Sequence, residues 1–136
     1  MPLEVAGVAP LLSVFEMPRA IRFYRDLLGF KVAATSPPLL ADPDHVNWCM
    51  LELNGSSVML NTAYDSHDQP GAPDTARWSG HSDTCLHFGC PDVEAAYAFI
   101  TAQGLHVDPP KVAPYGMNEL YLTDPDGYGL CFQWKA

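Results

Sequence analysis

The sequence predicts an α+β fold built from two tandem β-α-β-β-β modules, and two observations support this prediction. Residues 11–32 and 86–107 each run from an apolar strand-like segment through a turn, a helix and a glycine to a second strand-like segment. Two further strand-like segments follow in each half, joined by NG at residues 54–55 and by DPDG at residues 124–127. With 136 residues, 48% of them hydrophobic, the chain is long enough for one packed domain.

The helix of the first half is expected between Pro18 and Gly29. Proline suits the first helical turn, where its missing N–H costs nothing, and glycine adopts the conformation that ends many helices. The apolar stripe between them has helical spacing and consists of Ala20, Ile21, Tyr24, Leu27 and Leu28. Strands are then expected at residues 30–33, 48–53 and 57–60.

The helix of the second half is expected between Asp92, a good N-cap residue, and Gly104. Its predicted apolar stripe consists of Ala95, Ala96, Phe99 and Ile100. When Gly29 is aligned with Gly104, Ala20 falls on Ala95. Strands are then expected at residues 105–107, 119–123 and 129–134.

These elements divide the single domain, residues 1–136, into module one at residues 5–62 and module two at residues 84–135. The segment between them, residues 63–83, is polar and is interpreted as a linker and lid. Proline-rich loops at 36–43 and 108–114 are expected at the rim.

The DPDG sequence is compatible with either a calcium-binding loop or a turn. Calcium binding of the EF-hand type needs an acidic ligand at loop position 12, and that position, counted from Asp124, is Lys135. A turn fits better, because Pro125 fixes φ at the second position and Gly127 accepts a positive φ. The sequence therefore predicts a structural hairpin loop.

Charge and composition exclude several classes of function. The formal net charge is −9, with 16 acidic residues against seven lysines and arginines, which argues against binding nucleic acid or an anionic membrane. The first ten residues lack the features of a signal peptide, and no apolar segment has membrane-spanning length. We expect a cytoplasmic protein whose four cysteines are reduced thiols.

The doubled β-α-β-β-β pattern resembles the vicinal oxygen chelate superfamily, which includes glyoxalase I, bleomycin-resistance proteins, fosfomycin-resistance enzymes and extradiol dioxygenases. The similarity covers nearly the whole chain. It rests on AIRFYRDLLGF at residues 20–30, NGSSVML at 54–60, DVEAAYAFITAQG at 92–104 and YGMNELYLTDPDGYGL at 115–130.

The resemblance implies a curled mixed sheet whose one face packs on the helices and whose other face lines a ligand cup. Strand alternation then sorts the residues between the two faces. Leu120, Leu122, Leu130 and Phe132 are expected in the core. Core packing is also the expected role of Trp48 and Trp134. Ser13, Met59, Asn61, Cys85, His87, Glu119, Tyr121, Cys131 and Gln133 are expected on the cup face, with Trp78 and Tyr115 at its rim.

Metal enzymes of the superfamily carry histidine or glutamate at four cup positions, which the resemblance places at Ala9, Met59, Cys85 and Cys131. The position of Cys85 could equally fall on Thr84. None of these residues suits a hard divalent metal, so we expect no metal and no other cofactor there. The alternative is a soft site for Zn²⁺ or Cu⁺ made from Cys85, Cys131, Met59 and His87.

The first functional hypothesis is a metal-independent binding protein that resembles the bleomycin-resistance branch and sequesters an organic, preferably cationic, small molecule. The alternatives are a metal-dependent lyase or dioxygenase, and a metal-free enzyme with His87 or Glu119 as its acid–base group. His87 could instead be a structural histidine bonded to Glu119 or Tyr121. His81 lies in a polar loop and is expected to be solvated, whereas Trp78 could cover a flat ligand by stacking. The resemblance also implies a homodimer.

Overall fold

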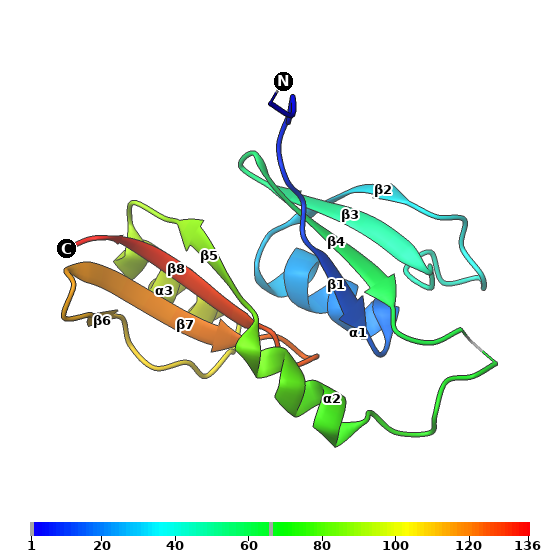
Figure 1. Ribbon diagram of the computed structural model, residues 1–136. Coiled ribbons are helices and arrows are strands. Elements are labelled where there is room, and N and C mark those ends of the chain that lie inside the picture. Colours follow the sequence, from blue (N-terminus) through cyan, green and yellow to red (C-terminus); the bar gives the residue numbers. More distant parts are fainter. Residues whose placement is uncertain (1, 66) are drawn as a thin grey trace. The chain divides into compact units, whose positions relative to one another are not determined.

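The computed structural model describes residues 2–65 and 67–136 and divides the chain into two compact units, Met1–Gly71 and Ala72–Ala136 (Figure 1). The elements of unit one are β1 (Leu11–Val14), α1 (Met17–Ile21), the π-helical turn η1 (Arg22–Leu27), β2 (Lys31–Thr35), β3 (Trp48–Leu53) and β4 (Ser56–Thr62). The elements of unit two are α2 (Thr75–Gly80), the 3₁₀ turn η2 (His81–Asp83), β5 (Cys85–Gly89), α3 (Val93–Ala102), β6 (Lys111–Val112), β7 (Met117–Thr123) and β8 (Gly129–Lys135).

Both units contain a four-stranded mixed sheet with the same strand order. The order is β1-β4-β3-β2 in unit one and β5-β8-β7-β6 in unit two. The first strand of each unit is parallel to its last strand, and the remaining pairs are antiparallel. The predicted α+β fold with a repeated β-α-β-β-β pattern is therefore confirmed. No helix in the described residues is long and apolar enough to cross a membrane.

The helix of unit one packs on its sheet and contains one residue more than its counterpart. Ala20, Ile21 and Tyr24 are almost completely buried, as the predicted stripe requires. Gly29 lies 12 residues after Met17, where α1 begins, whereas Gly104 lies 11 residues after Val93, where α3 begins. A π-helical turn accommodates a single extra residue, so η1 absorbs this difference.

The predicted stripe of α3 is partly wrong. Val93 and Ile100 are buried beneath the helix, which packs on β7 and β8, but Ala95 is exposed and Phe99 keeps 47% of its surface. The helix begins at Val93 after the Asp92 carboxylate caps the Ala95 N–H at 2.9 Å. Counted from that start, Ala20 corresponds to Ala96 instead of Ala95, because the π-helical turn shifts the alignment by one.

Three other expectations need correction. The segment at 105–107 is not a strand; β6 lies later, at Lys111–Val112, after two prolines that cannot donate hydrogen bonds to a sheet. The segment at 63–83 includes the unforeseen helix α2, capped by the Asp74 carboxylate. Trp134, expected in the core, is 45% exposed.

The DPDG loop forms the predicted turn. The Asp124 carboxylate is buried and accepts hydrogen bonds from the backbone N–H groups of Asp126 at 2.8 Å and Tyr128 at 3.0 Å. Gly127 has a φ of 92°, and its N–H bonds the Asp124 carbonyl. This carboxylate is thus satisfied by the backbone of its own loop.

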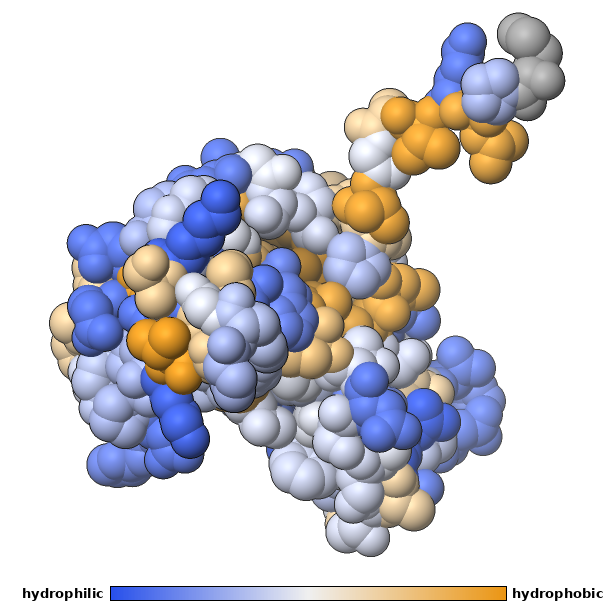
Figure 2. Space-filling model, turned by 60° about the vertical axis from the view of Figure 1, so that its left-hand side comes forward, coloured by the Kyte–Doolittle hydropathy of each residue, from blue (hydrophilic) through white to orange (hydrophobic). Residues whose placement is uncertain are grey.

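Residues 2–10 extend from β1 as an arm without regular structure (Figure 1, Figure 2). Leu3, Val5 and Val8 are largely exposed. Figure 2 shows hydrophobic surface along the arm.

Candidate functional site

The open face of the unit-two sheet brings ionisable side chains from three strands together. Leu120 and Leu130 are fully buried, so their neighbours on β7 and β8 point to the opposite face. The register pairs Cys131 of β8 with His87 of β5 on one side and with Tyr121 of β7 on the other.

Glu119 is the centre of this group and is only 7% exposed. Its Oε1 accepts a hydrogen bond from the Tyr115 hydroxyl at 2.8 Å, and its Oε2 accepts one from the Tyr121 hydroxyl at 3.3 Å. The Cys131 thiol donates a weak hydrogen bond to Oε2 at 3.9 Å. The His87 ring lies edge-on to Tyr121, with 6.1 Å between ring centroids.

The acidic groups around Glu119 are held in their neutral forms. Burial raises the pKa of the Cys131 thiol to about 11, and the Glu119 charge adds to this effect. Burial, followed by the Cys131 thiol and the Glu119 carboxylate, raises the pKa of Tyr121. Burial and Glu119 also raise the pKa of Cys85.

Glu119 has no cationic side chain as a partner in the described part of the chain, where its hydrogen bonds come from two phenols and a thiol. Phenol donors stabilise a carboxylate but do not balance its charge. A buried charge without a counter-ion favours the approach of a cation. The cluster of His87, Tyr115, Glu119, Tyr121 and Cys131 is hereafter the Glu119 cluster.

Cys85 and Gln133 flank the Glu119 cluster. Cys85 is half-buried and lies on β5 with the same orientation as His87, two residues away, whereas Thr84 precedes the strand. Gln133 is the register partner of Glu119.

The predicted residues of module one lie on β1 and β4 of unit one. Ser13 pairs with Asn61, and Leu11 pairs with Met59. Asn61 contributes to a shallow polar pocket of about 350 Å³, which also includes Asn47, Tyr64 and Asp65. Ala9 is half-buried just before β1 and has no donor atom in its side chain.

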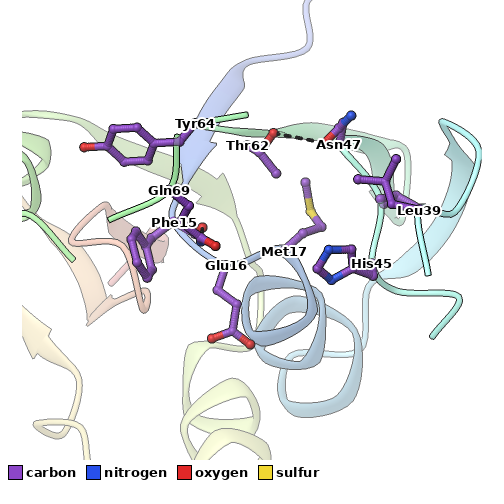
Figure 3. Close-up of a pocket in the computed structure, with 10 residues that line it drawn as sticks. Phe15, Glu16, Met17, Leu39, His45, Asn47, Thr62, Tyr64 and Gln69 are labelled. Carbon is purple, nitrogen blue, oxygen red and sulfur yellow. Dashed lines mark hydrogen bonds between the residues drawn. The ribbon is translucent and has the colours of Figure 1, made fainter. Parts of the chain in front are cut away.

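A second pocket in unit one was not foreseen from the sequence (Figure 3). Phe15, Met17, Leu39 and His45 are among its lining residues, and its volume is about 40 Å³. Organic ligands occupy pockets of roughly 300–1,000 Å³, so this cavity is too small for one.

Trp78, expected to cover a ligand, contacts the DPDG loop. Its indole N–H donates to the Pro125 carbonyl at 3.1 Å. His81 was expected to be solvated, but its Nδ1 lies 2.7 Å from the Asp126 carbonyl, and its ring stacks on Tyr128 at 4.1 Å. The carbonyl can only accept, so Nδ1 carries the proton and Nε2 accepts from the Tyr128 hydroxyl at 3.2 Å.

Sequence reasoning named every member of the Glu119 cluster but not its bonding. In the described residues the two tyrosines bond the Glu119 carboxylate, and His87 meets Tyr121 through an edge-on ring contact. Tyr115 reaches Glu119 because Gly116, with a φ of 92°, turns the chain just before β7. The sequence signal that could have predicted this bond is a tyrosine and a glutamate four residues apart with a glycine between them.

Paired β-α-β-β-β units with the strand order described above define the class of fold. A family model for the Glyoxalase/Bleomycin resistance protein/Dioxygenase superfamily matches residues 7–132, and the chain belongs to this superfamily. A comparison with curated proteins finds no match.

Three of the solved structures with the same fold illustrate the similarity. TioX from Micromonospora sp. ML1 is 16% identical, with 96% of this chain and 100% of that chain covered and a TM-score of 0.69. A bleomycin-binding protein complexed with bleomycin is 17% identical, with coverage of 97% and 100% and a TM-score of 0.70. TnmS3, an antibiotic binding protein from Streptomyces sp. CB03234, is 22% identical, with coverage of 99% and 100% and a TM-score of 0.66.

Proposed function

We propose that this protein binds and sequesters an organic small molecule that carries a cationic group, with Glu119 as the acceptor of that group. The observation that carries the proposal is the buried Glu119 carboxylate, which accepts hydrogen bonds from two phenols and a thiol and forms no ion pair among the described residues. Because solved structures with the same fold include a bleomycin-binding protein and an antibiotic binding protein, a binding role fits the fold.

The tyrosines give the site a second recognition element. Tyr115 and Tyr121 keep 69% and 49% of their surface exposed while their hydroxyls bond Glu119. Their rings can therefore contact a flat or cationic ligand, and aromatic faces attract both. Binding in this way uses no metal at Ala9, Met59, Cys85 and Cys131.

The proposal includes a homodimer, in which a second chain helps to enclose the ligand. The exposed apolar side chains of Leu3, Val5 and Val8 on the arm support it, because a run of neighbouring exposed apolar side chains commonly marks an interaction surface. Sedimentation equilibrium should give the mass of two chains, and a mass of one chain at micromolar concentration would reject this part of the proposal.

Calorimetry on Glu119→Gln tests the binding proposal. The substitution keeps the shape of the side chain but removes its charge, so it should weaken a cationic aromatic ligand by about 1.5–3 kcal/mol. A neutral aromatic ligand of the same shape should be almost unaffected.

Glu52→Gln is the matched control, since Glu52 is exposed on β3 of unit one. Equal losses for both ligands in Glu119→Gln would show that Glu119 is structural. No loss for either would remove it from the site.

A further inference from the structure

We propose that His87, Glu119 and Cys131 form a binding site for a zinc ion, contained entirely in unit two. One potential ligand atom from each residue, a ring nitrogen, a carboxylate oxygen and the thiol sulfur, lies within 4.8 Å of the other two. Glu119 and Cys131 are buried, while His87 is exposed and closes the group from the solvent side. The inference does not depend on the proposed function, because the metal alone is the ligand.

The geometry needs only small side-chain movements to accommodate the ion. Zinc–sulfur bonds of about 2.3 Å and zinc–oxygen or zinc–nitrogen bonds of about 2.0–2.2 Å, arranged tetrahedrally, place ligand atoms roughly 3.3–3.7 Å apart. The Cys131 sulfur and the Glu119 Oε2 are 3.9 Å apart. The three residues lie on neighbouring strands, whose register pairs His87 directly with Cys131.

The donor types select the metal. A set of one nitrogen, one oxygen and one sulfur suits Zn²⁺, whereas Ca²⁺ and Mg²⁺ prefer oxygen ligands alone. On binding, the Cys131 thiol releases its proton to solvent and His87 binds as the neutral imidazole. The carboxylate and thiolate then balance the two positive charges, and the fourth position is open to water or to a ligand atom.

The tyrosines supply the outer contacts that such a site needs. Tyr115 donates a short hydrogen bond to Oε1 and Tyr121 a longer one to Oε2. The metal would replace the thiol proton that Cys131 now donates to Oε2. Carboxylates that bind zinc are commonly held by hydrogen bonds of this kind, which fix their orientation.

This trio differs from the four positions that metal enzymes of the superfamily use. It shares only Cys131 with them, and it needs nothing from unit one. A second group of potential ligands, Asp65, His67 and Asp68, is fully exposed and lacks a buried donor. Zinc at the trio would occupy Glu119, so the ion and an organic cation should exclude each other there.

The test is a titration of the full-length, reduced and chelator-treated protein with Zn²⁺, in competition with a chromophoric indicator. We expect one ion per chain. With Co²⁺ in place of Zn²⁺, a thiolate-to-metal charge-transfer band should appear in the near ultraviolet. Loss of an outer contact commonly lowers metal affinity by about 10–100-fold. Cys131 and His87 would bind the ion directly, so Cys131→Ser and His87→Ala should each lower the affinity by more than about 100-fold.

Cys90→Ser is the matched control, because Cys90 is a half-buried thiol that donates to the Asp92 carbonyl outside the Glu119 cluster. His87→Ala guards against misfolding, since His87 is exposed and its loss removes no core contact. Retained affinity in Cys90→Ser with loss in both other variants supports the site. Absence of binding by the wild type, or unchanged binding in Cys131→Ser, overturns it. Zinc binding that is lost only in Cys85→Ser also overturns the proposed site. Calorimetry with the organic ligand on zinc-free protein tests the proposed function separately.

Discussion

The two units have the same strand order but carry different side chains at the same places on their open faces. In unit one, the register surrounds Met59 with Leu11 on β1 and Met50 on β3. In unit two, it surrounds Cys131 with His87 on β5 and Tyr121 on β7. Two residues further along β4 and β8, Trp48 pairs with Asn61 in unit one, and Glu119 pairs with Gln133 in unit two.

This difference separates scaffold from chemistry. The core-facing positions on β4 and β8 are apolar in both units, because burying them stabilises either sheet. The opposite faces are free to differ, since alternation along a strand makes them independent of the core. On its open face unit one carries thioether and aliphatic groups around Met59. At the corresponding positions around Cys131, unit two carries ionisable groups, the imidazole of His87 and the phenol of Tyr121.

The last hairpin of each unit provides the strongest contrast. Gly55 and Gly127 both have positive φ, at 86° and 92°. A Cβ on Gly55 would contact nothing within 4 Å, but a Cβ on Gly127 would overlap the Trp78 carbonyl oxygen. Gly55→Ala should therefore cost about 1–2 kcal/mol of unfolding free energy from backbone strain alone.

Gly127→Ala should cost roughly 3 kcal/mol or more, because the overpacking adds to the same strain. Denaturant unfolding of both variants measures the difference. If the two substitutions cost the same, α2 does not pack on the DPDG loop as described. Weaker protection of α2 amides from hydrogen exchange in Gly127→Ala would locate the damage.

The units also differ in how they hold their acidic side chains. In unit one, the Arg25 guanidinium bonds both oxygens of Asp44 at 2.9 Å and also bonds Asp26. In unit two, backbone N–H groups donate hydrogen bonds to the Asp124 carboxylate, and tyrosine hydroxyls donate to the Glu119 carboxylate. Arg25→Met should therefore lower stability at neutral pH by about 1 kcal/mol, given that the guanidinium is partly exposed.

The pH dependence has a definite sign. Hydrogen bonding to Arg25 lowers the pKa of Asp26, so the stabilisation is complete above the unfolded-state pKa and is lost as pH falls through the lower folded-state value. Stability curves between neutral pH and about pH 3 should be flatter for Arg25→Met than for wild type. Arg22→Met is the control, because Arg22 affects Asp26 only through its charge. Equal slopes in the wild type and Arg25→Met would contradict the assignment.

The sequence was sufficient to predict which residues face the core on β7 and β8. A period of two and a short turn fix the register, and a slip by one would have placed Leu120 and Leu130 on the open face. The same alternation predicts that Glu119, Tyr121 and Cys131 share the open face.

Other features carry no such signal. The π-helical turn adds a residue without changing composition, so aligning the glycines set Ala20 against Ala95 instead of Ala96. Helix α2 has no buried residue, so it shows no apolar periodicity. The bond between Tyr115 and Glu119 depends on a backbone turn at Gly116, which pattern alone does not define.

The smallest expected effect on stability comes from giving unit two a residue of unit one. His87→Leu places the Leu11 side chain at the corresponding register position, which is exposed in both units. Exposed substitutions usually change the unfolding free energy by less than about 0.5 kcal/mol, so thermal and denaturant midpoints should hardly move. Zinc affinity should nevertheless fall sharply, because leucine has no donor atom. A loss of stability comparable to that of Gly127→Ala would mean that His87 supports the sheet, and the difference between the two open faces would then be structural instead of chemical.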